Sequence, residues 1–146
     1  SLQKLSFNDN LIEGEIPASL GDITTLTKFS LGNNQLTGTI PDSLGKLINL
    51  DRFEVYKNNL TGELPESLGN LTLMKELIIF ENSFSGSIPL SYTNLKNVTD
   101  FYFFKTQLCE PTTPEFLAWK ALVGLGWQGT EVICMDFHCF MPIISR

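Results

Sequence analysis

The sequence predicts a repeat solenoid of the α/β class, and three observations carry that prediction. Apolar residues recur at a constant spacing of 24 residues in five successive copies, which begin at Leu2, Leu26, Leu50, Met74 and Val98. Within each copy, a short segment alternates apolar and solvent-facing positions, which is the period of a β-strand. Four copies then carry a glycine and an aliphatic–proline pair. A fixed period of this length is typical of stacked coils, because one such unit cannot bury its apolar face alone.

The first element of each copy is a strand, followed by a polar turn. The alternating segments predict strands near residues 4–7, 28–31, 52–55, 76–79 and 100–103. An asparagine follows the first four of them, and the fifth copy has Thr106 instead; the asparagines are Asn10, Asn34, Asn58 and Asn82. An amide side chain carries two donors and an acceptor on a short arm, so it is suited to holding the turn backbone of adjacent coils.

The second half of each copy predicts a short helical or 3₁₀ turn. The proline of the aliphatic–proline pair lacks an N–H and ends the extended segment. Apolar residues about three positions apart then follow, as in Leu44 and Leu47.

The complete phrase resembles the plant-type leucine-rich repeat. The carrying residues are those of the L-x-x-L-x-L-x-x-N-x-L pattern and its extension, as in Leu36-Thr37-Gly38-Thr39-Ile40-Pro41. The resemblance covers residues 2 to about 108. It implies a right-handed superhelix of five coils in residues 1–108, with a parallel sheet lining the concave face.

Residues 109–134 depart from the repeat and predict a helical cap. Thr113 is suited to be the N-cap of a helix that has Pro114 at its first position and Glu115 in its first turn. We expect Gly124 and Gly126 to end this helix, and residues 127–134 to return over the last coil. The helical spacing places one apolar face inward, formed by Phe116, Trp119, Leu122 and Val123.

The segment from Leu108 to Cys134 resembles the C-terminal cap of some plant-like repeat proteins, and this resemblance pairs Cys109 with Cys134. Two free thiols are the alternative. Cys139 is left over as an unpaired thiol, an intermolecular partner or another partner for Cys134. Together with His138, these cysteines have the residue types of a zinc site, but their spacing matches no common zinc pattern. We therefore predict no metal and no cofactor.

Composition excludes several classes of function. The chain has 10 basic and 16 acidic residues and a net charge of −6, which opposes binding to nucleic-acid phosphates. No apolar run of about 18 residues is present, so we expect no transmembrane segment. His138 is the single histidine, and no nucleophile or acid is repeated around it. We predict that the protein is not an enzyme.

Three N-x-S/T sequons make Asn59, Asn70 and Asn97 candidate glycosylation sites and favour an extracellular or lumenal location. The first arises almost automatically from the repeat phrase. Family members usually begin with a cysteine-containing cap, which is not found here, so we expect a fragment or a first coil covered by a neighbouring subunit. Residues 135–146 form a short apolar tail, expected to pack on the cap or to dock on another subunit or a membrane surface.

The solvent-facing strand positions predict the partner-binding site. Two columns change from small and polar to large and apolar along the array, and a third changes from basic to acidic. Stacked strands would gather the large residues in one apolar patch with charged margins, which is typical of interaction sites. The alternative is an aromatic ladder that only stabilises neighbouring strands. The candidate residues are Tyr56, Ile78, Phe80, Tyr102 and Phe104, with Arg52, Glu54, Glu76 and Asp100 at the margins.

These observations favour a non-catalytic protein- or peptide-recognition module, similar to the ectodomains of plant receptor-like proteins and kinases. Because fold alone does not fix function, two alternatives stay open. One is an inhibitor of a foreign cell-wall-degrading enzyme, and the other is a scaffold subunit of a multi-protein assembly. Reversible binding would favour recognition, and constitutive co-purification would favour the scaffold.

Overall fold

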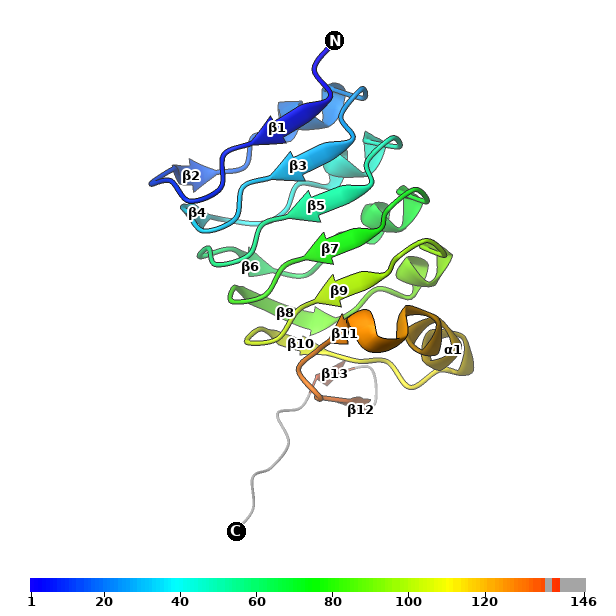
Figure 1. Cartoon of the computed structure of the whole chain (residues 1–146). Helices are drawn as coiled ribbons and strands as arrows, with labels where there is room; N and C mark the ends of the chain where they lie inside the picture. Colours follow the sequence, from blue (N-terminus) through cyan, green and yellow to red (C-terminus); the bar gives the residue numbers. More distant parts are fainter. Residues whose placement is uncertain (136–137, 140–146) are drawn as a thin grey trace.

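The computed structural model describes residues 1–135 and the backbone of residues 138–139. Its main feature is a parallel sheet of six strands stacked along the array in chain order (Figure 1). Neighbouring repeat strands pair residues that are 24 positions apart, such as Phe29 with Phe53. The strands are β1 (Lys4–Ser6), β3 (Lys28–Ser30), β5 (Arg52–Glu54), β7 (Glu76–Ile78), β9 (Asp100–Tyr102) and β11 (Trp127–Gln128). All five predicted repeat strands are confirmed, and β11 of the cap adds a sixth.

Short strands and 3₁₀ turns form the other side of each coil. The strands β2 (Glu13–Glu15) and β4 (Gln35–Thr37) pair with each other, and β6 (Thr61–Gly62), β8 (Ser83–Ser87) and β10 (Gln107–Cys109) form a second parallel group. The predicted 3₁₀ turns are η1 (Ala18–Asp22), η2 (Asp42–Lys46), η3 (Glu66–Asn70) and η4 (Leu90–Asn94). A proline directly precedes each turn. The fold is therefore a leucine-rich-repeat solenoid.

The core is a continuous column of apolar side chains between the two sides of the coils. Equivalent residues of successive coils are fully buried, as in Phe29 and Phe53, at 0% exposure. The first coil differs, because Leu2 and Phe7 are 49% and 52% exposed at positions that are buried in the following coils. Burial of the repeat positions therefore depends on a coil on each side.

The recurring phrase of the repeat places an asparagine where it binds two coils together. The Nδ2 of Asn58 donates to the carbonyl oxygens of Leu31 and Val55, each at 3.0 Å, and its Oδ1 accepts from the backbone N–H of Leu36 at 2.9 Å. Asn34 and Asn82 make the same set of bonds one coil earlier and one coil later. The predicted role of the asparagines is confirmed for these three.

The cap begins with the predicted helix, α1 (Pro114–Val123), whose N-cap Thr113 accepts a hydrogen bond from the Phe116 N–H at 3.3 Å. Phe116, Trp119 and Val123 are buried, but Leu122 is 58% exposed, so its placement on the buried face was wrong. At 3.6 residues per turn, Leu122 lies about 120° around the helix from Phe116. Gly124 ends the helix at φ +61°, a value that favours glycine.

After the helix, a 3₁₀ turn η5 (Gly124–Gly126) leads into β11. A Cβ on Gly126 would lie 1.6 Å from the Thr99 carbonyl oxygen, so only glycine allows the backbone to approach the last coil this closely. Trp127 then lies edge-on to the rings of Phe101, Phe103 and Trp119, with centroids 5.2–5.5 Å away. The aromatic residues of the cap thus cover the end of the core.

The cap is closed by covalent and polar contacts. A disulfide joins Cys109 to Cys134, with their Cα atoms 5.1 Å apart. The buried carboxylate of Glu110 forms an ion pair with Lys120 and accepts a hydrogen bond from Trp127 Nε1 at 3.1 Å. After the disulfide, β12 (Cys134–Met135) pairs antiparallel to β13 (His138–Cys139).

The expectations for the apolar tail and for the side chains of His138 and Cys139 lie outside the described residues. Within residues 1–135, no helix is long and apolar enough to cross a bilayer.

Candidate partner-binding face

We call the solvent-facing side of the six-stranded sheet the strand face. Alternate strand residues point to this side, while the intervening ones fill the core. Pairing in steps of 24 residues aligns equivalent positions into three columns across the strands. The charged column is Lys4, Lys28, Arg52, Glu76 and Asp100; the middle column is Ser6, Ser30, Glu54, Ile78 and Tyr102; the aromatic column is Asn8, Gly32, Tyr56, Phe80 and Phe104.

The three rings of the aromatic column are stacked. The centroids of Tyr56 and Phe80 are 5.1 Å apart with an interplanar angle of 12°, and those of Phe80 and Phe104 are 4.5 Å apart at 11°. Gly32 provides the base of the stack, since a Cβ there would lie 2.3 Å from Tyr56 Cε1. All three rings are half-buried, so they form a ladder and still present surface to solvent.

Ile78 contributes less to this surface than the sequence predicted. Its side chain is buried at 7% exposure, whereas Tyr102, Phe80 and Phe104 are half-buried. Its register partners on the two neighbouring strands are the longer side chains of Glu54 and Tyr102, which leave little room for water at a short β-branched residue. Ile78 is therefore part of the floor of the patch, and its expected exposure was wrong.

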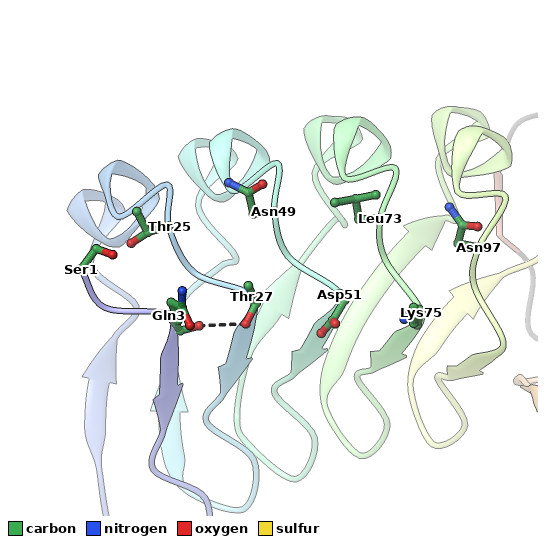
Figure 2. Close-up of a pocket in the computed structure, with 9 residues that line it drawn as sticks. All are labelled: Ser1, Gln3, Thr25, Thr27, Asn49, Asp51, Leu73, Lys75 and Asn97. Atoms are coloured by element: carbon green, nitrogen blue, oxygen red, sulfur yellow. Dashed lines mark hydrogen bonds between the residues drawn. The ribbon is translucent and has the colours of Figure 1, made fainter.

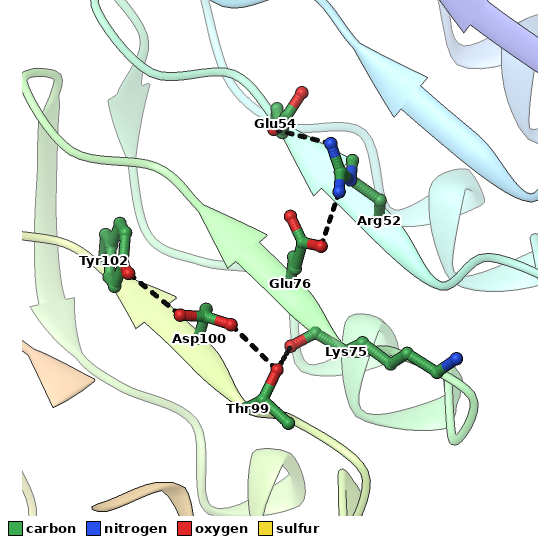
Figure 3. A network of polar contacts seen from close by, with 7 residues as sticks. All are labelled: Arg52, Glu54, Lys75, Glu76, Thr99, Asp100 and Tyr102. Atoms are coloured by element: carbon green, nitrogen blue, oxygen red, sulfur yellow. Dashed lines mark hydrogen bonds and ion pairs between the residues drawn. The ribbon is translucent and has the colours of Figure 1, made fainter. Parts of the chain in front are cut away.

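The charged column and the neighbouring middle column are joined by a network of ion pairs and hydrogen bonds (Figure 3). Arg52 lies between two carboxylates: its Nη2 is 2.5 Å from Glu76 Oε1, and its Nη1 is 3.7 Å from Glu54 Oε1. The carboxylates of Glu76 and Asp100 stand on directly paired strand positions. Arg52 thus offsets the charges of Glu54 and Glu76 but not that of Asp100.

Asp100 is held by hydroxyl groups instead. Its Oδ1 accepts a hydrogen bond from the Tyr102 hydroxyl at 2.9 Å, and its Oδ2 accepts one from Thr99 Oγ1 at 2.8 Å. In the described part of the chain, no basic side chain lies within ion-pair distance of this carboxylate. Figure 3 shows the nearby Lys75 side chain extending away from it. Asp100 is therefore oriented by neutral donors and keeps its negative charge available.

The surroundings of Tyr56 and Tyr102, which include nearby carboxylates, raise the pKa of both hydroxyls. The hydrogen bond to Asp100 raises the pKa of Tyr102, together with burial and the negative charges of Asp100 and Glu76. Burial raises the pKa of Tyr56, together with the charges of Asp9 and Glu54. Both hydroxyls therefore stay protonated at neutral pH, beside a surface of negative potential. The sequence pointed to Tyr56, Tyr102 and the carboxylates but gave no sign of the roles of Thr99 and Gly32.

A second surface feature, not anticipated from the sequence, is a groove of about 620 Å³ at the N-terminal ends of the sheet strands (Figure 2). Several of its polar side chains bind the preceding coil: Thr27 Oγ1 donates to the Gln3 carbonyl at 3.1 Å, Asn49 Nδ2 to the Thr24 carbonyl at 2.9 Å, and Asn97 Nδ2 to the Thr72 carbonyl at 2.8 Å. These side chains therefore stabilise the stacking of the coils.

Other candidate chemistry is sparse in the described residues. No group of three or more histidine, cysteine or acidic side chains is placed to hold a metal ion among residues that the structure describes. The sequon residues Asn59, Asn70 and Asn97 are all exposed. Their glycosylation stays a prediction.

Comparison with known proteins agrees with this architecture. The Leucine Rich Repeat family model matches residues 1–23, 25–47 and 49–71. Comparison with curated protein sequences gives no significant match.

Solved structures extend the likeness to most of the chain. The Arabidopsis receptor kinase HAESA, solved with the peptide hormone IDA and the co-receptor SERK1, is 32% identical over 95% of this chain and 23% of that one (TM-score 0.77). A TDR receptor is 35% identical over 80% and 20% of the two chains (TM-score 0.76). The BIR2 ectodomain from Arabidopsis thaliana is 29% identical over 76% and 61% (TM-score 0.70). The chain thus spans about a fifth of the first two proteins.

Proposed function

We propose that this chain, a leucine-rich-repeat protein of the plant type, is a non-catalytic recognition module. It binds a peptide or protein on its strand face. The observation that carries the proposal is the half-buried ladder of Tyr56, Phe80 and Phe104 on the same face as Asp100. The core is filled by the repeat positions, so stability does not require aromatic residues on the solvent side. Aromatic side chains with exposed surface are enriched among binding hot spots.

Two further observations support this function and an extracellular or lumenal location. Similar structures include a receptor kinase that is bound to a peptide hormone and a co-receptor. The cap contains a disulfide, a bond that persists in oxidising compartments. We extend peptide recognition from the similar ectodomains to this chain as part of the proposal.

A selection experiment tests the proposal and does not require the partner to be identified first. The full chain is immobilised and used to select from a phage library that displays random 12-residue peptides. We expect enriched peptides whose binding falls by more than about 2 kcal/mol when Phe80 and Phe104 are both replaced by serine, because this change removes two of the three stacked rings of the ladder.

The matched control replaces two exposed leucines elsewhere, Leu90 and Leu122, by serine. These lie on η4 and α1, away from the strand face, so the control variant should bind the selected peptides as the parent chain does. Circular dichroism must show that both variants are folded. If no peptide is enriched, or if the enriched peptides bind the Phe80→Ser/Phe104→Ser variant unchanged, recognition on the strand face is refuted.

A further inference from the structure

We propose that the strand face binds an extended segment with the side-chain order apolar–basic–apolar, in which the basic residue pairs with Asp100. This inference rests on the proposed function, because it specifies the partner of the same face. The segment crosses the strands above the middle column. It directs alternate side chains to the aromatic column on one side and to the charged column on the other.

The aromatic column fixes the apolar positions of the partner. Its three rings cover about 10 Å from the first centroid to the last, in two steps of 5.1 and 4.5 Å. Side chains on the same side of an extended chain repeat every 6.4–6.8 Å or so, which is two residues. The ladder is therefore long enough for two apolar side chains at positions i and i+2, each seated between or against the ring edges.

The charged column fixes the residue between them. The side chain at i+1 points away from the ladder and toward Glu76 and Asp100, which lie on paired positions of β7 and β9. Arg52 already offsets Glu76 at 2.5 Å, whereas two hydroxyls hold Asp100 without neutralising it. An arginine or lysine there would gain a charge-assisted hydrogen bond to Asp100 and lie beside the Tyr102 ring.

In the five described coils, aromatic surface and acidic charge occur together on the strand face only in the third to fifth coils. In the first two coils the charged column is basic, at Lys4 and Lys28, but the adjacent middle and aromatic columns hold Ser6, Ser30, Asn8 and Gly32. Those coils offer a charge without an apolar surface. The third to fifth coils carry the aromatic rings together with three carboxylates, Glu54, Glu76 and Asp100, against one basic residue of these columns, Arg52. The excess of negative charge in these columns therefore favours a basic partner.

The peptides selected by the parent chain test this inference. We expect the enriched sequences to share the order apolar–basic–apolar. Synthetic 12-residue peptides with this order should bind the full chain about tenfold or more tightly than versions in which glutamate replaces the basic residue, measured by fluorescence anisotropy.

The decisive variant is Asp100→Asn, which keeps an acceptor for the Tyr102 hydroxyl and removes the charge. It should lose the tenfold preference for the basic peptide but bind a peptide with norleucine at the central position as the parent chain does. Asp51→Asn, at a half-buried aspartate that lines the groove, is the matched control and should change neither affinity.

The possible outcomes separate the two proposals. Selected peptides that depend on Phe80 and Phe104 but show no basic preference, or an acidic one, overturn this inference and leave the proposed function in place. An Asp100→Asn variant that retains the preference also overturns it. Failure to select any peptide that depends on Phe80 and Phe104 removes both.

Discussion

The two sides of the same strands differ in how far the residue type changes from coil to coil. On the core side, the residues at equivalent positions hardly change along the array, as Phe29, Phe53, Leu77 and Phe101 show, and each is at most 1% exposed. On the solvent side, the equivalent positions change from Asn8 and Gly32 to Tyr56, Phe80 and Phe104. The core side must match the neighbouring coil, and the solvent side is free to match something outside the chain.

This difference explains why aromatic rings on the two sides have different consequences. Phe29 and Phe53 stack at 5.2 Å inside the core, and Phe80 and Phe104 stack at 4.5 Å on the strand face. The stacking geometry is similar, but only the core pair is fully removed from water. Stability should therefore depend on the first pair, and binding on the second.

The largest expected effect breaks the core side. Phe53→Ala should lower the free energy of unfolding by about 3–5 kcal/mol, because it removes buried surface and leaves a cavity between two coils. The matched change Phe80→Ala on the strand face should cost about 0.5–1.5 kcal/mol, the value of lost ring contacts. Urea unfolding followed by circular dichroism measures both. Equal losses would contradict the assignment of separate roles to the two sides.

A smaller effect is expected at the turn that follows the strands. Asn58→Ala should destabilise the chain by about 1–3 kcal/mol, because it leaves the buried N–H of Leu36 without the Oδ1 acceptor and frees two carbonyl groups. The adjacent and exposed Asn59 provides the comparison: Asn59→Ala should stay within about 0.5 kcal/mol of the parent. Thermal unfolding of the two variants would test this, and a loss as large at Asn59 would refute the specific role of Asn58.

The same comparison shows which parts of the structure the sequence could predict. The repeat strands, the 3₁₀ turns and the asparagine contacts each follow from a position that recurs every 24 residues, so several copies support each inference. The cap occurs once, and its helix was predicted from a local signal, Thr113-Pro114, while its exposed Leu122 was assigned to the wrong face. β11 was not predicted as a strand of the sheet, because Trp127 and Gln128 carry no repeat phrase.

The candidate site was predictable in its composition and not in its contacts. The columns are fixed by the repeat period, so the sequence alone could align Tyr56, Phe80 and Phe104. The burial of Ile78 depends on how far the side chains of its neighbours extend, and the hydroxyl contacts of Asp100 depend on rotamers. Neither property repeats along the chain, so no periodic signal reports it.

The smallest expected effect sharpens the comparison, because it concerns a solvent-side position at which the backbone conformation restricts the residue type. Lys57 lies directly after the aromatic column and has φ +50°, and the equivalent residues of the other coils, Asp9, Asn33, Glu81 and Lys105, have φ between +53° and +59°. Asparagine and aspartate tolerate this left-handed conformation better than lysine or glutamate. Lys57→Asn should therefore stabilise the chain by about 0.5 kcal/mol, as measured by urea unfolding. Lys46→Asn, at an exposed residue of η2, is the control and should give no gain. A loss of stability in Lys57→Asn would contradict this prediction. It would show that contacts of the lysine side chain outweigh the conformational cost of its positive φ.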